Sequence, residues 1–95
     1  MFDITKEEIE EVKNNFLISE KPLVLKVFPA REKKKYIVAT LIIELFDVGK
    51  EYRESEVNDI LVNIHDDYAT IRRFLVDNKF LYRDRLGTRY IKTIG

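Results

Sequence analysis

The segment YIVATLIIELF, residues Tyr36–Phe46, limits the folds open to this chain more than any other feature. Only Thr40 and Glu44 within it are polar, so a helix over this segment is apolar on nearly every side and must be buried on most of them. Gly49 follows and predicts a helix end, because glycine adopts left-handed backbone geometry at little cost. We therefore predict a central helix against which the other elements pack.

Three further helices are predicted around it. Thr5 and Glu8 have capping-box spacing at the start of ITKEEIEEVKNNFL, and the apolar residues that follow recur at helical spacing. The segment SEVNDILVNI shows the same recurrence. A last helix is predicted from HDD onward, with Asp66 or Asp67 as its cap and Ile71 on its buried side together with Leu75.

Extended segments separate and follow these helices. LVLKVF is typical of a short strand or an extended segment packed on the core, and KEY is a candidate short strand. FLYRD, a turn at RLG and TRYIKTI predict a β-hairpin. The resulting order predicts an α+β fold, a winged helix-turn-helix with an extra N-terminal helix and a C-terminal β-hairpin wing. The length favours one domain over residues 1–95, with the N-terminal helix and extended segment in 1–28 and the winged-helix core in 29–95.

Composition removes several classes of function. The chain has no cysteine and one histidine, His65, which excludes disulfides, thiolate chemistry and multi-histidine metal sites. Its two serines, Ser19 and Ser55, do not lie beside His65 in the sequence. We therefore expect a protein that is not an enzyme and has no cofactor or metal. Whether His65, with Asp66 and Asp67, has a metal or acid–base role stays open.

Targeting signals are also missing from the sequence. No apolar run approaches the roughly 20 residues that a membrane span needs. The acidic start MFDITKEEIEE lacks the basic and apolar regions of a secretory signal. These features predict a cytoplasmic protein without a membrane partner.

Charge is balanced overall but unevenly distributed. The formal net charge is zero, which gives no support for a nucleic-acid partner. Residues 1–20 hold six acids and two bases, about −4, whereas residues 72–92 hold seven bases and two acids, about +5. This asymmetry indicates either an anionic partner for the C-terminal third or a solvated surface whose two ends attract each other.

The helix after Asp67 carries three candidate contacts to DNA. Helical geometry places Thr70 and Arg73 opposite the buried side, where arginine can bind guanine and threonine can contact phosphate or a thymine methyl. Arg72 lies to one side and suits a phosphate contact. The alternative is structural: Arg73 and Asp77 have the i, i+4 spacing of an ion pair, and the paired aspartates at the helix start would repel phosphates.

The predicted wing supplies the other candidates. Arg83, Arg85 and Arg89 flank the tip Leu86–Gly87–Thr88, and Lys92 follows. A hairpin with arginines near its tip can follow a phosphate backbone or enter a minor groove. The alternative is an ordinary solvated hairpin. The basic run REKKK, residues 31–35, is either an accessory phosphate contact or a solvated first turn.

Two resemblances bear on these predictions. ATIRRFL and FLYRDRLGTRYI are similar to the recognition helix and wing of GntR-type winged-helix regulators. More broadly, FPAREKKK, FDVGKEYRESEVNDIL, HDDYATIRRFLVDNKFLYRD and GTRY, between Phe28 and Tyr90, resemble the bacterial domain-of-unknown-function family 2087. That resemblance implies an association with transcriptional regulators. Arg53 departs from the family pattern, which has a small hydroxyl residue there, so the next helix begins either there or at Ser55.

The hypothesis that follows is a small cytoplasmic winged-helix domain that binds double-stranded DNA or regulates transcription through its wing and third core helix. The competing hypothesis is a protein-interaction or scaffolding module with this shape that does not bind DNA. A homodimer or a regulatory protein partner is left open. Three roles are open for the acidic N-terminal helix: covering the core, pairing with a second copy of the chain, or masking the basic wing.

Overall fold

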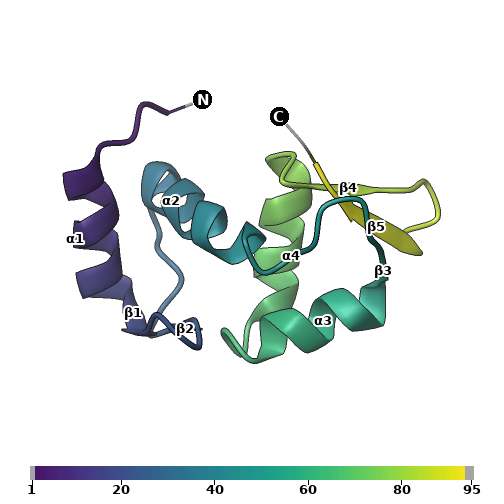
Figure 1. Ribbon diagram of the computed structural model, residues 1–95, viewed down its shortest axis with the longest axis horizontal. Helices are drawn as coiled ribbons and strands as arrows, with labels where there is room; N and C mark the ends of the chain where they lie inside the picture. Colours follow the sequence, from purple (N-terminus) through teal and green to yellow (C-terminus); the bar gives the residue numbers. More distant parts are fainter. Residues whose placement is uncertain (1, 94–95) are drawn as a thin grey trace.

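The computed structural model describes residues 2–93. In this part of the chain the fold is α+β, with four helices and two small antiparallel sheets (Figure 1). The first sheet pairs β1 with β2, and the second has the strand order β3-β5-β4. In chain order the elements are α1 (Lys6–Phe16), β1 (Leu17–Ser19), β2 (Val24–Leu25), α2 (Glu32–Ile43), β3 (Glu51–Arg53), α3 (Glu54–Val62), α4 (Tyr68–Asp77), β4 (Leu81–Arg83) and β5 (Arg89–Lys92).

Helix α2 is the central element, as its apolar sequence predicted. Its residues Ile37, Val38, Ala39 and Ile42 are almost fully buried, and they join residues of every other helix in one hydrophobic core. The helix ends at Ile43, earlier than the apolar run suggested, and Gly49 takes its positive φ of 78° in the turn before β3. No helix between residues 2 and 93 is long and apolar enough to cross a membrane.

Helices α3 and α4 and the three-stranded sheet complete the core. Val57 and Leu61 of α3 and Ile71 and Leu75 of α4 are buried, as their helical spacing predicted. Tyr90 of β5 is 1% exposed and anchors the sheet to these helices. The predicted hairpin is confirmed as β4 and β5, although Ile94, at the end of its second predicted strand, lies outside the described residues.

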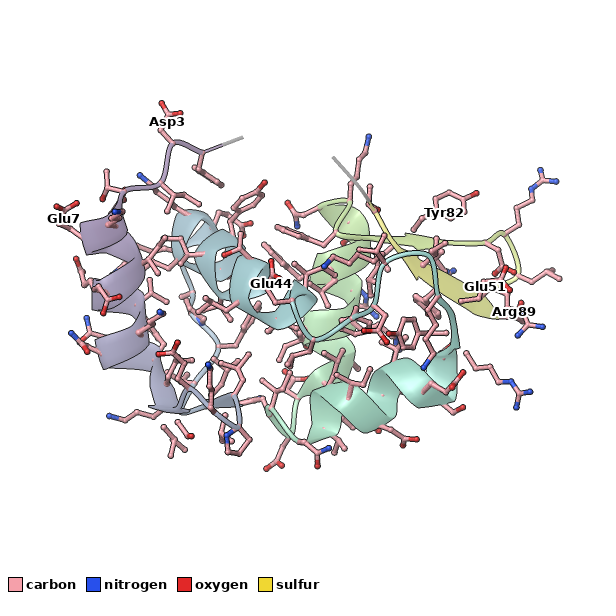
Figure 2. All side chains as sticks on the ribbon, in the orientation of Figure 1. Asp3, Glu7, Glu44, Glu51, Tyr82 and Arg89 are labelled. Carbon is pink, nitrogen blue, oxygen red and sulfur yellow. The ribbon has the colours of Figure 1, made fainter. Side chains whose placement is uncertain are left out.

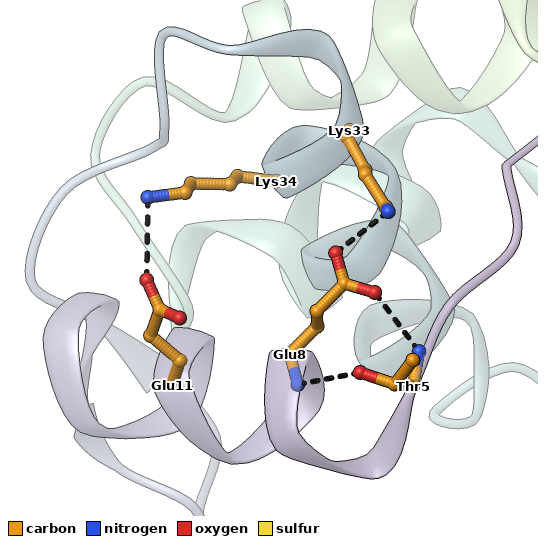
Figure 3. A network of polar contacts seen from close by, with 5 residues as sticks. All are labelled: Thr5, Glu8, Glu11, Lys33 and Lys34. Carbon is orange, nitrogen blue, oxygen red and sulfur yellow. Dashed lines mark hydrogen bonds and ion pairs between the residues drawn. The ribbon is translucent and has the colours of Figure 1, made fainter.

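Helix α1 begins with the predicted capping box. The Thr5 backbone N–H donates to Glu8 Oε1 at 3.0 Å, and the Glu8 N–H donates to Thr5 Oγ1 at 3.1 Å (Figure 3). The Lys33 ammonium lies 2.6 Å from Glu8 Oε2 and, with the capping bond, lowers the pKa of Glu8 below its ordinary value of 4.5. Polar contacts thus hold both the start of α1 and its position against α2.

The basic run at the start of α2 is neutralised within the molecule. Lys33 pairs with Glu8, Lys34 lies 3.7 Å from Glu11, and Lys35 lies 3.2 Å from Glu32 of its own helix. The three lysines of this run are therefore engaged in ion pairs. Helix α1 lies at the end of the molecule opposite the β4–β5 hairpin, so it does not mask the hairpin (Figure 1).

Helix α3 begins at Glu54, directly after β3, and not at Ser55. Arg53 occupies the N-cap position with extended backbone, and its N–H donates to Glu56 Oε1 at 2.9 Å. The arginine side chain has no oxygen with which to accept a bond from the first turn of the helix. One half of a capping box is therefore present and the other half is missing.

We expect Arg53→Ser to stabilise the protein, because a serine hydroxyl at an N-cap accepts a backbone N–H bond worth about 1 kcal/mol relative to alanine. Urea unfolding should give a higher free energy of unfolding for Arg53→Ser than for the control Arg53→Ala, which removes the same charge without adding an acceptor. Equal stability of the two variants would contradict the cap geometry.

Candidate nucleic-acid interface

Helix α4 presents the outward face that its sequence predicted. Ile71 and Leu75 are buried, whereas Thr70, Arg73 and Asp77 are exposed. Thr70 and Arg73 are therefore accessible to a partner. Because its opposite side is fixed in the core, α4 is a rigid support for these side chains.

The start of α4 differs from the prediction. Asp67 is at the N-cap position, but neither it nor Asp66 caps the helix with its side chain. The Asp67 backbone N–H instead donates to His65 Nδ1 at 3.0 Å. The His65 ring thus acts as a hydrogen-bond acceptor in the turn, and no group of acids and histidine suited to a metal ion occurs within residues 2–93. Both aspartates remain exposed at the end of α4 that carries positive partial charge.

Arg72 is bound within the protein. Its Nη1 donates to Asn58 Oδ1, and its Nη2 lies 3.3 Å from Glu54 Oε1, so one guanidinium joins α4 to two residues of α3. The Arg72 side chain is only 20% exposed. Its sequence position predicts a phosphate contact. The structure shows contacts of Arg72 within the protein, and Arg72 also lines the hollow described next, so the phosphate contact stays a prediction.

A small hollow lies between α4 and the C-terminal hairpin. Its volume is about 100 Å³. We call it the α4–hairpin hollow; it is lined by Arg72, Arg73, Val76 and Asp77 of α4 and by Arg83 and Tyr90 of the hairpin. The predicted Arg73–Asp77 ion pair is absent among the described residues, although both side chains line the hollow. Three arginine residues from two elements therefore line a space that has one acidic residue, Asp77, in its lining.

The strand pairing decides which hairpin arginine faces this hollow. Arg83 pairs with Tyr90, and side chains of paired residues lie on the same face of a sheet. Because Tyr90 is buried against the helices, Arg83 is on the inner face, beside α4. The next residue along β5, Arg89, is on the outer face because successive side chains alternate. The predicted arginines of the hairpin therefore do not form one patch.

The remaining hairpin candidates occupy two further positions. Arg85 is exposed in the loop at the tip, beside Leu86, which is 84% exposed. Lys92 is partly buried on the inner face, and its Nζ donates to the Phe46 carbonyl at 3.4 Å. Of the seven predicted contacts, the structure thus gathers Arg72, Arg73 and Arg83 at one place and separates Thr70, Arg85, Arg89 and Lys92 from it.

Asp84 organises the tip of the hairpin. Its Oδ1 accepts the Thr88 N–H at 2.8 Å and the Arg89 N–H at 3.2 Å, and its Oδ2 accepts the Thr88 hydroxyl at 2.8 Å. Gly87 has a positive φ of 69°, and a Cβ there would lie 3.4 Å from the Arg83 guanidinium. The Asp84 carboxylate therefore holds the backbone of the tip in place.

We expect the order of this tip to depend on pH. The Thr88 hydroxyl, followed by backbone N–H groups, lowers the pKa of Asp84 below its ordinary value of 3.8. A lowered pKa means that the carboxylate bonds are fully present above the ordinary value and are lost as pH falls through the lowered one. The Thr88 amide resonance should shift in that acidic range, and in Asp84→Ala it should already have its low-pH position at neutral pH. A Thr88 resonance that is the same in both proteins would contradict this role.

The α4–hairpin hollow and both faces of the sheet lie within a segment shared with other proteins. The family model DUF2087, described as an uncharacterized protein conserved in bacteria, matches residues 24–92, from β2 to the end of β5. Helix α1 and β1 precede the matched segment. Neither the search of curated proteins nor that of solved structures found a match. The local similarity to GntR-type regulators stays a prediction, whereas the broader resemblance is confirmed: the chain belongs to the DUF2087 family.

Proposed function

We propose that this chain is a small DNA-binding domain of the winged-helix type that acts in transcription regulation in the cytoplasm. The order α2, β3, α3, α4, β4, β5 supports this proposal, because a helix, a short strand, two helices and a hairpin follow one another as in such domains. The first strand of this order, β3, pairs with β5 of the hairpin and joins the helices to it. In these terms α4 is the exposed second helix and β4–β5 is the wing.

The observation that carries the proposal is the α4–hairpin hollow. Its volume of about 100 Å³ leaves room for one phosphate group, and guanidinium groups are the preferred bidentate ligands of phosphate. Arg73 and Arg83 are exposed and face this space from the helix and from the wing. Arg72 shares its charge with Glu54, so Arg73 and Arg83 are the main phosphate ligands.

The charges of α4 favour contact with the DNA backbone over reading of bases. In groove-reading helices the N-terminal residues approach the base edges. Here Asp66 and Asp67 are exposed at that end and repel phosphates on both sides of a groove. We propose that Arg73, Arg83 and the tip residue Arg85 contact phosphates, with Thr70 as an additional contact. Such contacts supply affinity that depends little on sequence.

One observation favours the alternative of a protein-interaction module. The exposed aspartates at the start of α4 coexist with large exposed apolar residues elsewhere, including Val48, which is 62% exposed, and Leu45, which is 47% exposed. A domain with no net charge and such residues can bind a regulatory protein without contacting DNA. The experiment on duplex DNA below separates the two functions.

We expect the protein to bind a labelled DNA duplex with an affinity that falls steeply as salt rises. Arg73→Ala/Arg83→Ala should weaken binding of all duplex sequences alike and lower the slope of log affinity against log salt by about 0.9 for each phosphate that the variant no longer neutralises. Fluorescence anisotropy over a series of salt concentrations measures both quantities. Arg31→Ala is the matched control for charge of the single variants Arg73→Ala and Arg83→Ala, because Arg31 is exposed at the start of α2, away from the hollow.

Two results would count against the proposal. A folded protein that does not bind duplex DNA at low salt would favour the protein-interaction module. An equal fall in affinity in Arg31→Ala and in either single variant of the hollow would show that only overall charge matters. Circular dichroism of each variant establishes that the compared proteins are folded.

A further inference from the structure

The face of the three-stranded sheet turned away from the helices carries a second cluster of charged and aromatic side chains. Strand pairing sets Arg53 opposite Arg89, Glu51 opposite Ile91, and Tyr82 opposite the same Ile91. These five residues therefore share one face, which we call the outer face. Figure 2 shows the labelled side chains Glu51, Tyr82 and Arg89 projecting from the hairpin end of the molecule.

Arg53 and Arg89 form a pair that proteins normally avoid. Residues directly opposite on antiparallel strands have their Cβ atoms about 5 Å apart, and like charges in such a pair are destabilising. Both side chains are exposed, and neither belongs to an ion pair formed within residues 2–93. An anion placed between the two guanidinium groups would remove the repulsion and add two charge-assisted hydrogen bonds.

A hollow of about 200 Å³ lies beside Arg89, one member of this pair. It is lined by Glu51, Tyr82, Asp84, Arg89, Tyr90 and Ile91. The Tyr82 side chain is 64% exposed although it is large and aromatic. An exposed aromatic ring on a sheet is a surface on which a planar base can stack, whatever its sequence.

The two acidic residues that line this hollow are Asp84 and Glu51, and their positions determine where its positive charge lies. The Asp84 carboxylate is directed toward the tip of the hairpin, where it accepts bonds from the Thr88 hydroxyl and from the backbone N–H groups of Thr88 and Arg89. Glu51 is paired with Ile91, two residues along β3 from Arg53. The outer face thus has an aromatic and apolar end beside Glu51 and a cationic end at Arg53 and Arg89. A ligand with a planar base and an adjoining phosphate matches both ends.

We propose that the outer face binds single-stranded nucleic acid, with one base stacked on Tyr82 and an adjoining phosphate between Arg53 and Arg89. This goes beyond the duplex binding proposed above, since the α4–hairpin hollow lies on the opposite side of the sheet. The two surfaces use different residues. Binding at one can therefore be abolished while binding at the other is retained.

The test measures the fluorescence anisotropy of labelled oligothymidylate and oligouridylate, about eight nucleotides long, which is within the span of one small binding domain. Tyr82→Ser should weaken binding roughly 5- to 150-fold, the range expected when one stacked base is removed, while Tyr82→Phe keeps the ring and the affinity. Arg53→Ser should also weaken binding, even though serine at that position is expected to stabilise α3. Arg31→Ala, remote from the sheet, should bind as the unmodified protein does.

Several outcomes would overturn this inference. Absence of single-strand binding at low salt in the folded protein overturns it, whether or not duplex DNA binds. If Arg73→Ala/Arg83→Ala abolished single-strand binding while Tyr82→Ser left it unchanged, the nucleic acid would bind on the side of the sheet that faces α4. Equal competition by polyglutamate in the unmodified protein and in Tyr82→Ser would show a surface for polyanions in general, such as an acidic protein segment. Retained duplex binding in Tyr82→Ser and Arg53→Ser separates this inference from the proposed function.

Discussion

The guanidinium of Arg72 links the helix that carries one candidate surface to the helix that continues into the sheet. By binding Asn58 and Glu54 it joins α4 to α3, and α3 is continuous with β3 of the sheet. One partly buried side chain therefore connects α4 to α3 and, through α3, to strand β3. A half-buried charge with two partners costs more to break than an exposed ion pair, because the remaining groups are left without partners away from bulk water. Arg73 follows Arg72 by one helical step, which places it on the exposed face of α4, where it lines the α4–hairpin hollow.

The zero net charge of the chain arises within each half of the sequence: residues 1–46 hold eight acids and eight bases, and residues 47–95 hold nine of each. Glu8 and Glu11 of α1 are paired with Lys33 and Lys34 of α2, at the end of the molecule away from the hairpin (Figure 1). These two acids are thus paired at a distance from the hairpin, and exposed charges farther apart than the Debye length of about 8–10 Å interact weakly. The acids that lie beside the arginines of the sheet and of α4 are Glu51, Asp77 and Asp84. The attraction of a charged partner to this chain therefore depends on the local charge around the sheet and not on the net charge.

Sequence periodicity is sufficient to predict the helices, the capping box of Thr5 and Glu8 and the hairpin, because each of these depends on residues close together in the chain. It is insufficient wherever a partner comes from a distant element. Local sequence suggests a phosphate contact for Arg72. It does not reveal the partners of Arg72, Glu54 and Asn58, because these residues lie in another helix. At the start of α4 the predicted N-cap residue, Asp67, is confirmed, but its side chain accepts no capping bond, and its backbone N–H donates to the His65 ring. The register of β4 with β5 places Arg83 and Arg89 on opposite faces, and the register of β3 with β5 sets Arg89 opposite Arg53.

Tyr90 determines that the sheet presents two different cationic faces. It is 1% exposed, and a shift of β5 by one residue would place its ring in solvent and turn Arg89 toward α4. The burial of one large aromatic residue therefore selects the register, and the register assigns Arg83 to the helices and Arg89 to the outer face. The two faces are separated by the sheet itself, and the bases of a duplex are stacked on one another. The proposed stacking on Tyr82 therefore requires a strand whose bases are unpaired.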